Sequence, residues 1–342
     1  MGTGWLASLE DEAGRVLPSY VHEYVRQGSG GSVSADEAAD AWSRYRLVPR
    51  VLRGNGEVDA TASFLGYRAT APFGVAPTTL QRAADLEGEL AMARGCAAAG
   101  VPMVLSSNAA TGLEEIGRST AHWWLQAYLT EDRELVRPLL AAACKAGAAA
   151  IVLTVDTPVV ARKHDGGGVS ALELVPARWL RTNLGPAADA AKARDLGLAD
   201  IAWIRAATGL PVVVKGVLHP ADADAAVDAG AAAVWVSNHG GRQLDRAVPT
   251  ALALADVVVA VRERVPVYVD GGIRSGIDTL TALALGADAV FVGRLPFYAL
   301  AVEGAAGVRR LFTALSEDLR EALLLSGCTD LVAAKALTVR VL

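Results

Sequence analysis

A histidine in the segment Ser237–Asp245 (SNHGGRQLD) has the neighbours that proton abstraction from an organic acid requires. His239 follows an apolar run, and Arg242 comes three residues later, where its guanidinium can hold a carboxylate. Asp156 closes another apolar run and could orient the imidazole and stabilise its protonated form. A base, an orienting carboxylate and an anion clamp together favour general-base chemistry. A histidine after a strand is more often a structural residue, so this interpretation requires the three groups to meet.

A lysine at the end of the apolar run Val212–Val214 is a second candidate for chemistry. Because Lys215 directly follows apolar residues that are expected to be buried, its charge needs a stabilising partner. Two roles are open: a Schiff-base lysine, or a cation that faces the pyrimidine edge of a flavin. The spacing does not choose between them.

Two turns that contain glycine and arginine predict an anion site. Asp270–Arg274 (DGGIR) and Gly293-Arg294 each follow an apolar run. Glycine lets backbone N–H groups approach an anion, and arginine supplies paired donors. The alternative is that the glycines serve tight turns and the arginines only the surface. The recurrence of the pattern after two successive runs favours a phosphate site.

These polar residues sit at the ends of apolar runs that alternate with alanine-rich helical stretches from about Ala71 onward. Eight runs are predicted to be strands: Pro72–Ala76, Pro102–Leu105, Trp123–Ala127, Ala149–Val155, Pro211–Lys215, Ala232–Ser237, Val265–Asp270 and Ala289–Gly293. Eight alternating units favour an α/β fold of the (β/α)₈ barrel type over an open doubly wound sheet. In such a barrel the carboxyl ends of all strands meet at one mouth.

The first 70 residues do not follow this repeat, and they are too few to fold alone. They are predicted as a helix, a loop, a second helix and a segment that is irregular or forms short strands: Trp5–Gln27, Gly28–Ser34, Ala35–Tyr45 and Arg50–Phe64. We expect this N-terminal part to close the floor or one side of a barrel that residues 71–342 form.

The interval of about 157–199 is also irregular and contains Gly166–Gly168. A connection of this length predicts a lid over the mouth, with a disordered insert as the alternative.

Composition narrows the classes of partner. The 32 Lys+Arg and 37 Asp+Glu give a net charge of −5 without long runs of one sign, which disfavours nucleic acid and membrane surfaces. Three scattered cysteines, Cys96, Cys144 and Cys328, provide neither a disulfide framework nor spaced metal ligands. We therefore expect a cytoplasmic protein without a bound metal.

Several segments, in this order along the chain, resemble the FMN-dependent 2-hydroxy acid oxidase/dehydrogenase family, which includes glycolate and lactate oxidases and mandelate dehydrogenases. They are Thr154–Pro158 (TVDTP), Val214–Gly216 (VKG), Ser237–Asp245, Asp270–Arg274, Ala282–Arg294 (ALALGADAVFVGR) and Leu325–Cys328 (LSGC). The resemblance extends from Leu17-Pro18 to Cys328. It implies an FMN-binding barrel that oxidises an (S)-2-hydroxy acid to the 2-oxo acid, in a homotetramer. We expect O₂ as acceptor and H₂O₂ as by-product, with a dehydrogenase that uses another acceptor as the alternative, because no motif separates the two.

The resemblance also implies residue roles. His239 would remove the hydroxyl proton as hydride leaves C2 for the flavin, and Asp156 would stabilise the imidazolium. Arg242 would clamp the substrate carboxylate, and Tyr24 and Tyr128 would hydrogen-bond the substrate. Lys215 would be the cation near flavin N1. The residues implied to bind FMN are Ala76, Pro77, Thr78, Ser106, Gln126, Thr154, Lys215, Ser237, Asp270, Gly271, Gly272, Arg274, Gly293 and Arg294.

Three departures from the family pattern affect the substrate. The place of the second carboxylate-binding arginine holds Lys163, so we assign that role to the neighbouring Arg162, with Lys163 as the alternative. Glycolate oxidases have a Trp where this chain has Asn108, which predicts a wider pocket and adds Asn108 to the expected substrate contacts. The lid interval is shorter than is typical, which predicts a more open mouth.

A wider pocket favours an aryl substrate such as mandelate or 4-hydroxymandelate. The alternatives are an oxidase or dehydrogenase of short acids such as lactate or glycolate, a non-redox flavin isomerase of a diphosphate, and a phosphate-binding barrel without activity. The isomerase has no need of the pair His239 and Arg242, so the sequence disfavours it.

Overall fold

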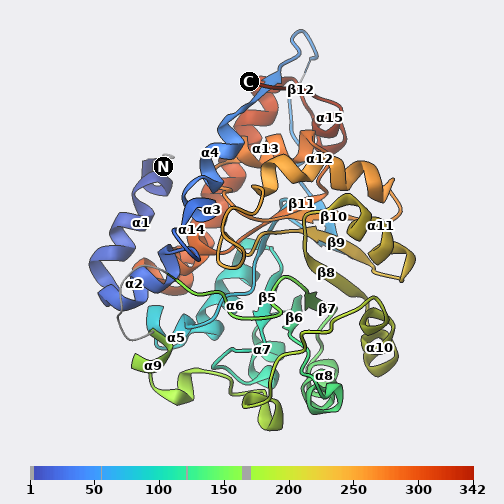
Figure 1. Ribbon diagram of the computed structural model, residues 1–342. Helices are drawn as coiled ribbons and strands as arrows, with labels where there is room; N and C mark the ends of the chain where they lie inside the picture. Colours follow the sequence, from blue (N-terminus) through green and yellow to red (C-terminus); the bar gives the residue numbers. More distant parts are fainter. Residues whose placement is uncertain (1–3, 55, 121, 164–170) are drawn as a thin grey trace.

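The computed structural model describes residues 4–54, 56–120, 122–163 and 171–342, and its centre is a closed barrel of parallel strands (Figure 1). The barrel strands are β4 (Phe73–Val75), β5 (Met103–Ser106), β6 (Trp123–Ala127), β7 (Ile151–Thr154), β8 (Val212–Val217), β9 (Ala233–Val236), β10 (Val267–Val269) and β11 (Ala289–Val292). Neighbours in sequence pair in register, and β11 closes the barrel on β4 through Val290 and Phe73. The predicted (β/α)₈ barrel is confirmed, and each predicted run overlaps one strand.

The strands form because they are short runs of β-branched and aromatic residues that are buried on both faces, as parallel strands require. Large rings fill the interior: Trp235 stacks on Phe291 at 3.9 Å between ring centroids, and Tyr268 and Trp124 pack beside them. The barrel is therefore a packed core and not a pore.

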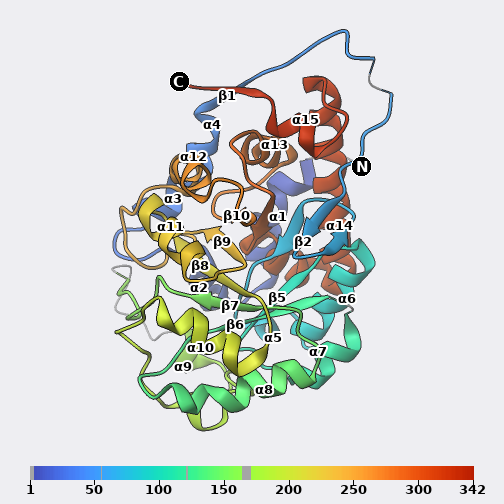
Figure 2. The same ribbon diagram turned by 90° about the vertical axis from the view of Figure 1, so that its right-hand side faces the viewer.

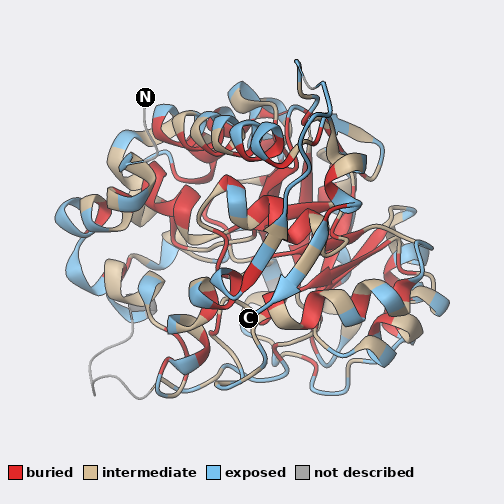
Figure 3. Ribbon diagram, turned by 90° about the horizontal axis from the view of Figure 1, so that it is seen from above, coloured by how far each residue is buried: buried red, intermediate tan, exposed pale blue. Residues whose placement is uncertain are grey.

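Helices cover the outside of the barrel and turn their apolar faces inward (Figure 3). The longer ones are α6 (Glu89–Ala99), α7 (Leu113–Ser119), α8 (Arg137–Lys145), α10 (Ala199–Thr208), α11 (Pro220–Asp228), α12 (Thr250–Val261), α13 (Gly276–Ala284) and α14 (Arg294–Ser326). The short ones are α5 (Gln81–Ala84), α9 (Ala171–Leu174), α15 (Leu331–Lys335) and the 3₁₀ turns η1 (Arg133–Val136), η2 (Ala177–Trp179) and η3 (Gly185–Ala188). Within the described ranges, the helices include none with the length and apolarity to cross a bilayer.

The N-terminal segment corrects two of our predictions. The helix expected over Trp5–Gln27 is two helices, α1 (Gly4–Val16) and α2 (Ser19–Arg26), because Pro18 interrupts the helical hydrogen bonds and disfavours a helical residue before it.

The helix expected over Ala35–Tyr45 is likewise two short ones, α3 (Val33–Asp36) and α4 (Ala38–Ser43). Tyr45 instead begins β1 (Tyr45–Val48), which pairs antiparallel with β12 (Thr338–Val341) at the far end of the chain (Figure 2).

A hairpin of β2 (Ala62–Phe64) and β3 (Tyr67–Ala69) lies at the barrel end opposite the strand carboxyl ends. Phe64 is fully buried and contacts the rings of Trp124, Tyr268 and Phe291. The segment that we predicted as irregular or as short strands thus contains the short strand β2. The division of the chain at residue 70 stays a prediction.

Residues 181–193 lie across the loops that follow β5 and β6. Thr182 N donates to Ala109 O at 3.1 Å, and Ala193 N donates to Leu129 O at 2.9 Å. Both ends of this stretch are therefore fixed to the barrel mouth. Gly166–Gly168 lie outside the described residues, and a lid function for the interval stays a prediction.

Candidate active site

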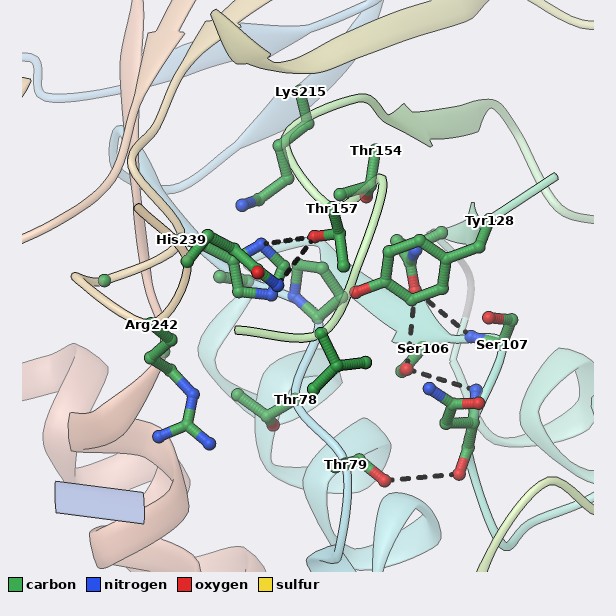
Figure 4. Close-up of a pocket in the computed structure, with 18 of the residues that line it drawn as sticks. Thr78, Thr79, Ser106, Ser107, Tyr128, Thr154, Thr157, Lys215, His239 and Arg242 are labelled. Atoms are coloured by element: carbon green, nitrogen blue, oxygen red, sulfur yellow. Dashed lines mark hydrogen bonds between the residues drawn. The ribbon is translucent and has the colours of Figure 1, made fainter. Parts of the chain in front are cut away.

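A cavity of about 1120 Å³ opens at the carboxyl ends of the barrel strands (Figure 4). The predicted site residues that line it are Tyr24, Ala76, Pro77, Thr78, Ser106, Asn108, Gln126, Tyr128, Thr154, Lys215, His239, Arg242, Asp270, Gly271, Gly272, Arg274, Gly293 and Arg294. Asp156 and Ser237 lie behind this lining and hydrogen-bond to it. Arg162 is exposed and is not part of the lining.

His239 and Asp156 form a pair, with His239 Nδ1 at 2.9 Å from Asp156 Oδ1. Because Nδ1 faces the carboxylate, Nε2 is the nitrogen that a ligand in the cavity can meet. Burial alone would raise the pKa of Asp156, but His239 and Lys215 outweigh it and hold that pKa below its ordinary value. An anionic Asp156 favours a neutral imidazole with its proton on Nδ1 and stabilises the imidazolium once Nε2 accepts a proton.

The turn that carries His239 has an unusual backbone. His239, Gly240 and Gly241 all have left-handed φ angles, of 59°, 64° and 74°. A non-glycine residue in this region is strained, and such strain persists only where the surroundings hold it. A Cβ at Gly241 would overlap the backbone of Ala35, and Ser29 N donates to Gly241 O at 2.9 Å. The N-terminal segment thus fixes the turn that aims His239.

Thr157 and Gln243 complete the surroundings of the pair, and our sequence analysis gave them no role. Thr157 Oγ1 lies 3.0 Å from Asp156 Oδ1 and 3.4 Å from His239 Nδ1, and accepts a hydrogen bond from Gln243 Nε2 at 2.9 Å. Since Gln243 donates, the Thr157 hydroxyl proton is free to reach Asp156. Both residues lie within segments that carry the family resemblance, and this was the signal in the sequence that could have identified them.

Gly216 allows Asp156 to come close to β8. Its φ is +111°, and a Cβ there would stand 2.7 Å from Asp156 Cβ. The register between β8 and β9 also shifts between Lys215 and Val217. A glycine is therefore required at this point of the site.

Lys215 has the partner that its burial demands. Its Nζ lies 3.1 Å from Asp270 Oδ2 and donates to Ser237 Oγ at 2.8 Å, and Ser237 in turn donates to Asp270 Oδ1 at 2.7 Å. All three side chains are buried. An ammonium held in an ion pair favours the cationic role over the neutral amine that a Schiff base needs.

Arginines crowd the side of the cavity next to α2. Arg242 Nη1 donates to Tyr24 O at 2.7 Å and to Gln27 O at 2.9 Å. The guanidinium carbon of Arg242 also lies 4.7 Å from the centroid of the Tyr24 ring. Arg294 Nε donates to Val25 O at 3.0 Å. Burial, with the nearby charges of Arg242 and Arg274, lowers the pKa of Arg294 to about 10. Such crowding of like charge is relieved by a bound anion.

Lys163, not Arg162, reaches this cationic side. Its Nζ lies 4.6 Å from the centroid of the Tyr24 ring and has no hydrogen-bond partner among the described residues. Burial, with Arg242 and Arg294, lowers the pKa of Lys163 to about 7, against the opposing effect of Glu23. Adjacent residues of an extended chain point to opposite sides, which explains why the structure does not support a pocket role for Arg162.

The remaining donors fit the flavin that the resemblance implies. Within the part of the chain that the structure describes, Gln126 Nε2 and Thr154 Oγ1 are buried without a partner. Both belong to residues that line the cavity, so they suit the polar edge of an isoalloxazine ring. At Gly293 the nearest atoms to an added Cβ stand 3.7 Å away, and Arg274 lines the same region, which leaves room and charge for a phosphate.

Comparisons with known proteins agree with this geometry. Residues 13–340 match the family model of the FMN-dependent dehydrogenases. The human 2-hydroxyacid oxidase 1 is 40% identical over 340 residues, which cover 94% of this chain and 92% of that protein. The 4-hydroxymandelate oxidase of Amycolatopsis orientalis is 41% identical over 352 residues, 98% of each. The crystal structure of mandelate oxidase superposes with a TM-score of 0.92 at 40% identity over 98% of both chains.

Proposed function

The chain belongs to the FMN-dependent dehydrogenase family, and from this premise we propose that its substrate is an (S)-2-hydroxy acid with an aryl ring on C2. The protein is an FMN-dependent 2-hydroxy acid oxidase. The observation that carries the 2-hydroxy acid part of the proposal is the Asp156–His239 pair, with 2.9 Å between Oδ1 and Nδ1, in one cavity with Arg242. The aryl part rests on Asn108, which lines the same cavity. O₂ is the proposed acceptor of the electrons.

FMN, when bound, supplies the acceptor for the hydride from C2. His239 Nε2 takes the proton of the substrate hydroxyl, and Asp156 holds the ring and stabilises the resulting imidazolium. Arg242 and Lys163 hold the substrate carboxylate on the α2 side of the cavity. Tyr128 and Tyr24, which line the same cavity, hydrogen-bond the substrate.

The cofactor-binding roles of the predicted residues remain proposals as well. Lys215, held by Asp270 and Ser237, would supply a positive charge to the pyrimidine edge of the flavin. Gln126, Thr154 and Ser106 would offer polar atoms to that ring, and so would the backbone of residues 76–78. Gly271, Gly272, Arg274, Gly293 and Arg294 take the ribityl and phosphate end.

Room for an aryl group comes from the residue after Ser107. Asn108 is half-buried in the cavity lining, and its backbone oxygen is fixed by Thr79 Oγ1 at 3.3 Å and Arg181 N at 3.2 Å. With the backbone fixed, the size of this side chain sets how far the cavity extends. An amide there leaves space for a ring and can also pair with a polar ring substituent.

We expect mandelate and 4-hydroxymandelate to reduce the flavin faster than (S)-lactate or glycolate, by about 10-fold or more, because a pocket built for a ring gains little from a small substituent. Anaerobic stopped-flow bleaching at saturating acid measures the order, and later admission of air with H₂O₂ detection tests the acceptor. Asn108→Trp is the matched variant, and it should shift the preference toward the short acids. Faster reduction by glycolate or lactate in the wild type would contradict the aryl proposal and leave the family assignment intact.

The substrate KM is expected to rise with pH through the titration of Lys163. Below its pKa of about 7 the ammonium helps hold the carboxylate, and above it that charge is lost. KM should therefore increase several-fold between about pH 6 and about pH 9, with less change in kcat. In Lys163→Arg, which keeps its charge, KM should stay low at every pH in this range. In Lys163→Gln, which has no charge, KM should stay high at every pH. A wild-type profile that Lys163→Arg leaves unchanged would assign the titration to another group.

A homotetramer and a cytoplasmic location are further proposals. Exposed apolar side chains gather where the loop after β1 meets the end of α14, at Val51, Leu52, Leu324 and Leu325, and Arg50 N donates there to Ser326 O at 3.0 Å. Such a patch supports burial against another copy of the chain. Sedimentation equilibrium of the holoenzyme measures the number of copies, and a monomer would contradict the tetramer.

A further inference from the structure

Lys192 is a cavity residue for which the proposed reaction has no use. The stretch around it pairs with the continuation of β6: Ala193 N donates to Leu129 O at 2.9 Å, and Glu131 N donates to Ala191 O at 3.0 Å. This pairing sets Lys192 opposite Thr130, and both residues line the cavity. The position of the lysine is thus fixed by backbone hydrogen bonds on each side of it.

The ammonium of Lys192 lies over the ring of Tyr128, with 3.5 Å between Nζ and the ring centroid. The side chain is half-buried, and its Nζ makes no ion pair or hydrogen bond with any residue that the structure describes. Burial, with a smaller contribution from Arg181, lowers the pKa of Lys192 to about 8, against the opposing effect of Asp156. The face of one ring compensates only part of the cost of burying a cation.

Carboxylates along this stretch and at the mouth have other partners: Asp156, whose charge acts on Lys192, is bound to His239 at 2.9 Å. Arg133 forms ion pairs with Asp195, at 2.8 Å between Nη1 and Oδ1, and with Asp200, at 3.1 Å between Nε and Oδ1. Between residues 181 and 194, the charged residues that line the cavity are Arg181, Asp189, Lys192 and Arg194, so this side of the mouth carries a positive excess.

This positive group is separate from the one that holds the C1 carboxylate. Lys163 lies on the ring of Tyr24, which belongs to α2, whereas Lys192 lies on the ring of Tyr128, which follows β6. A cavity with two separate cationic groups suits a ligand with two anionic groups.

We propose that Lys192 is a specificity-determining residue that binds a second carboxylate, carried by the C2 aryl substituent of the substrate. The proposal rests on the proposed function and names its substrate class as an aryl 2-hydroxy acid with an anionic ring substituent. The second carboxylate would give the ammonium an anionic partner, which it does not have among the residues that the structure describes. Tyr128 keeps its place below the ammonium and its hydrogen bond to the reacting end.

The test compares mandelate with 4-carboxymandelate and 3-carboxymandelate as reductants of the flavin under anaerobic conditions. In the wild type we expect one of the carboxylated acids to exceed mandelate in kcat/KM by about 10-fold, as a partly buried charge pair can provide. Lys192→Met should remove that advantage and change the mandelate value by less than about 3-fold, while Lys192→Arg should keep most of it. Retained flavin absorbance shows that each variant is folded and loaded, and Lys192→Gln replaces Lys192→Met if the latter does not load.

A binding measurement supplies a readout apart from turnover. Titration calorimetry of the wild-type holoenzyme should show terephthalate binding more tightly than benzoate, and Lys192→Met should bring the two Kd values together. If Lys192→Met lowers kcat/KM equally for mandelate and carboxymandelate, Lys192 only supports Tyr128 and the proposal is overturned. A wild type that does not prefer the carboxylated acids would overturn it as well. If no 2-hydroxy acid reduces the wild-type flavin, the proposed function fails, and the terephthalate comparison still decides the role of Lys192.

Discussion

His239→Ala enzyme is expected to load FMN and to be reduced by its substrate about 10²–10⁴-fold more slowly than the wild type, the range that a positioned general base contributes. The loss follows from the geometry, because Asp156 accepts the Nδ1 proton at 2.9 Å and leaves Nε2 to act on the hydroxyl. Single-turnover bleaching of the flavin under anaerobic conditions measures this step without the reaction with O₂. Flavin absorbance before mixing shows that the cofactor is retained.

Two companion variants separate the base from its supports. Asp156→Asn keeps the shape but removes the charge that stabilises the imidazolium, so its loss should also be large. Thr157→Val removes one hydrogen bond to Asp156 and should cost about 10-fold or less, the effect of about 1 kcal/mol. Bleaching of His239→Ala at a near wild-type rate would remove His239 from the mechanism.

The barrel could be predicted because its signals are local. Each strand is a short apolar run bounded by Gly, Pro or a polar residue, and helical stretches separate the runs, so the alternation alone indicates the topology. The pairing of β1 with β12 has no such signal, because it joins residues at the two ends of the chain. The break between α1 and α2 did have a local signal, which is Pro18. The apolar periodicity on both sides of Pro18 obscured that signal.

The candidate site was predictable where chemistry coincides with a strand end. His239, Asp156 and Lys215 all follow apolar runs, so one topological rule brings them to one mouth. The choice between Arg162 and Lys163 could not be made this way, since it depends on which way one residue of an irregular segment points. Lys192 gave no signal at all, because its place in the cavity depends on the pairing of a loop with residues 129–131.

Lys215→Met is expected to lower the free energy of unfolding of the holoenzyme by about 3–5 kcal/mol, the cost of removing one partner from a buried ion pair. Asp270 would keep the hydrogen bond from Ser237 Oγ at 2.7 Å but lose the ammonium that stands 3.1 Å from its Oδ2. Its side chain is only 9% exposed, so water cannot replace the lost charge. Urea unfolding at one fixed FMN concentration compares the variants, because bound cofactor adds to the apparent stability.

The source of that loss can be separated from the loss of the lysine's packing. In Lys215→Met/Asp270→Asn no carboxylate remains to be buried alone, so the double variant should recover more than half of the stability that Lys215→Met loses. Ser237→Ala, which removes a hydroxyl but no charge, should cost about 1–3 kcal/mol and provides the matched control. If the double variant is no more stable than Lys215→Met, the lysine contributes through packing and cofactor contact, and the ion pair with Asp270 adds little to the stability of the barrel.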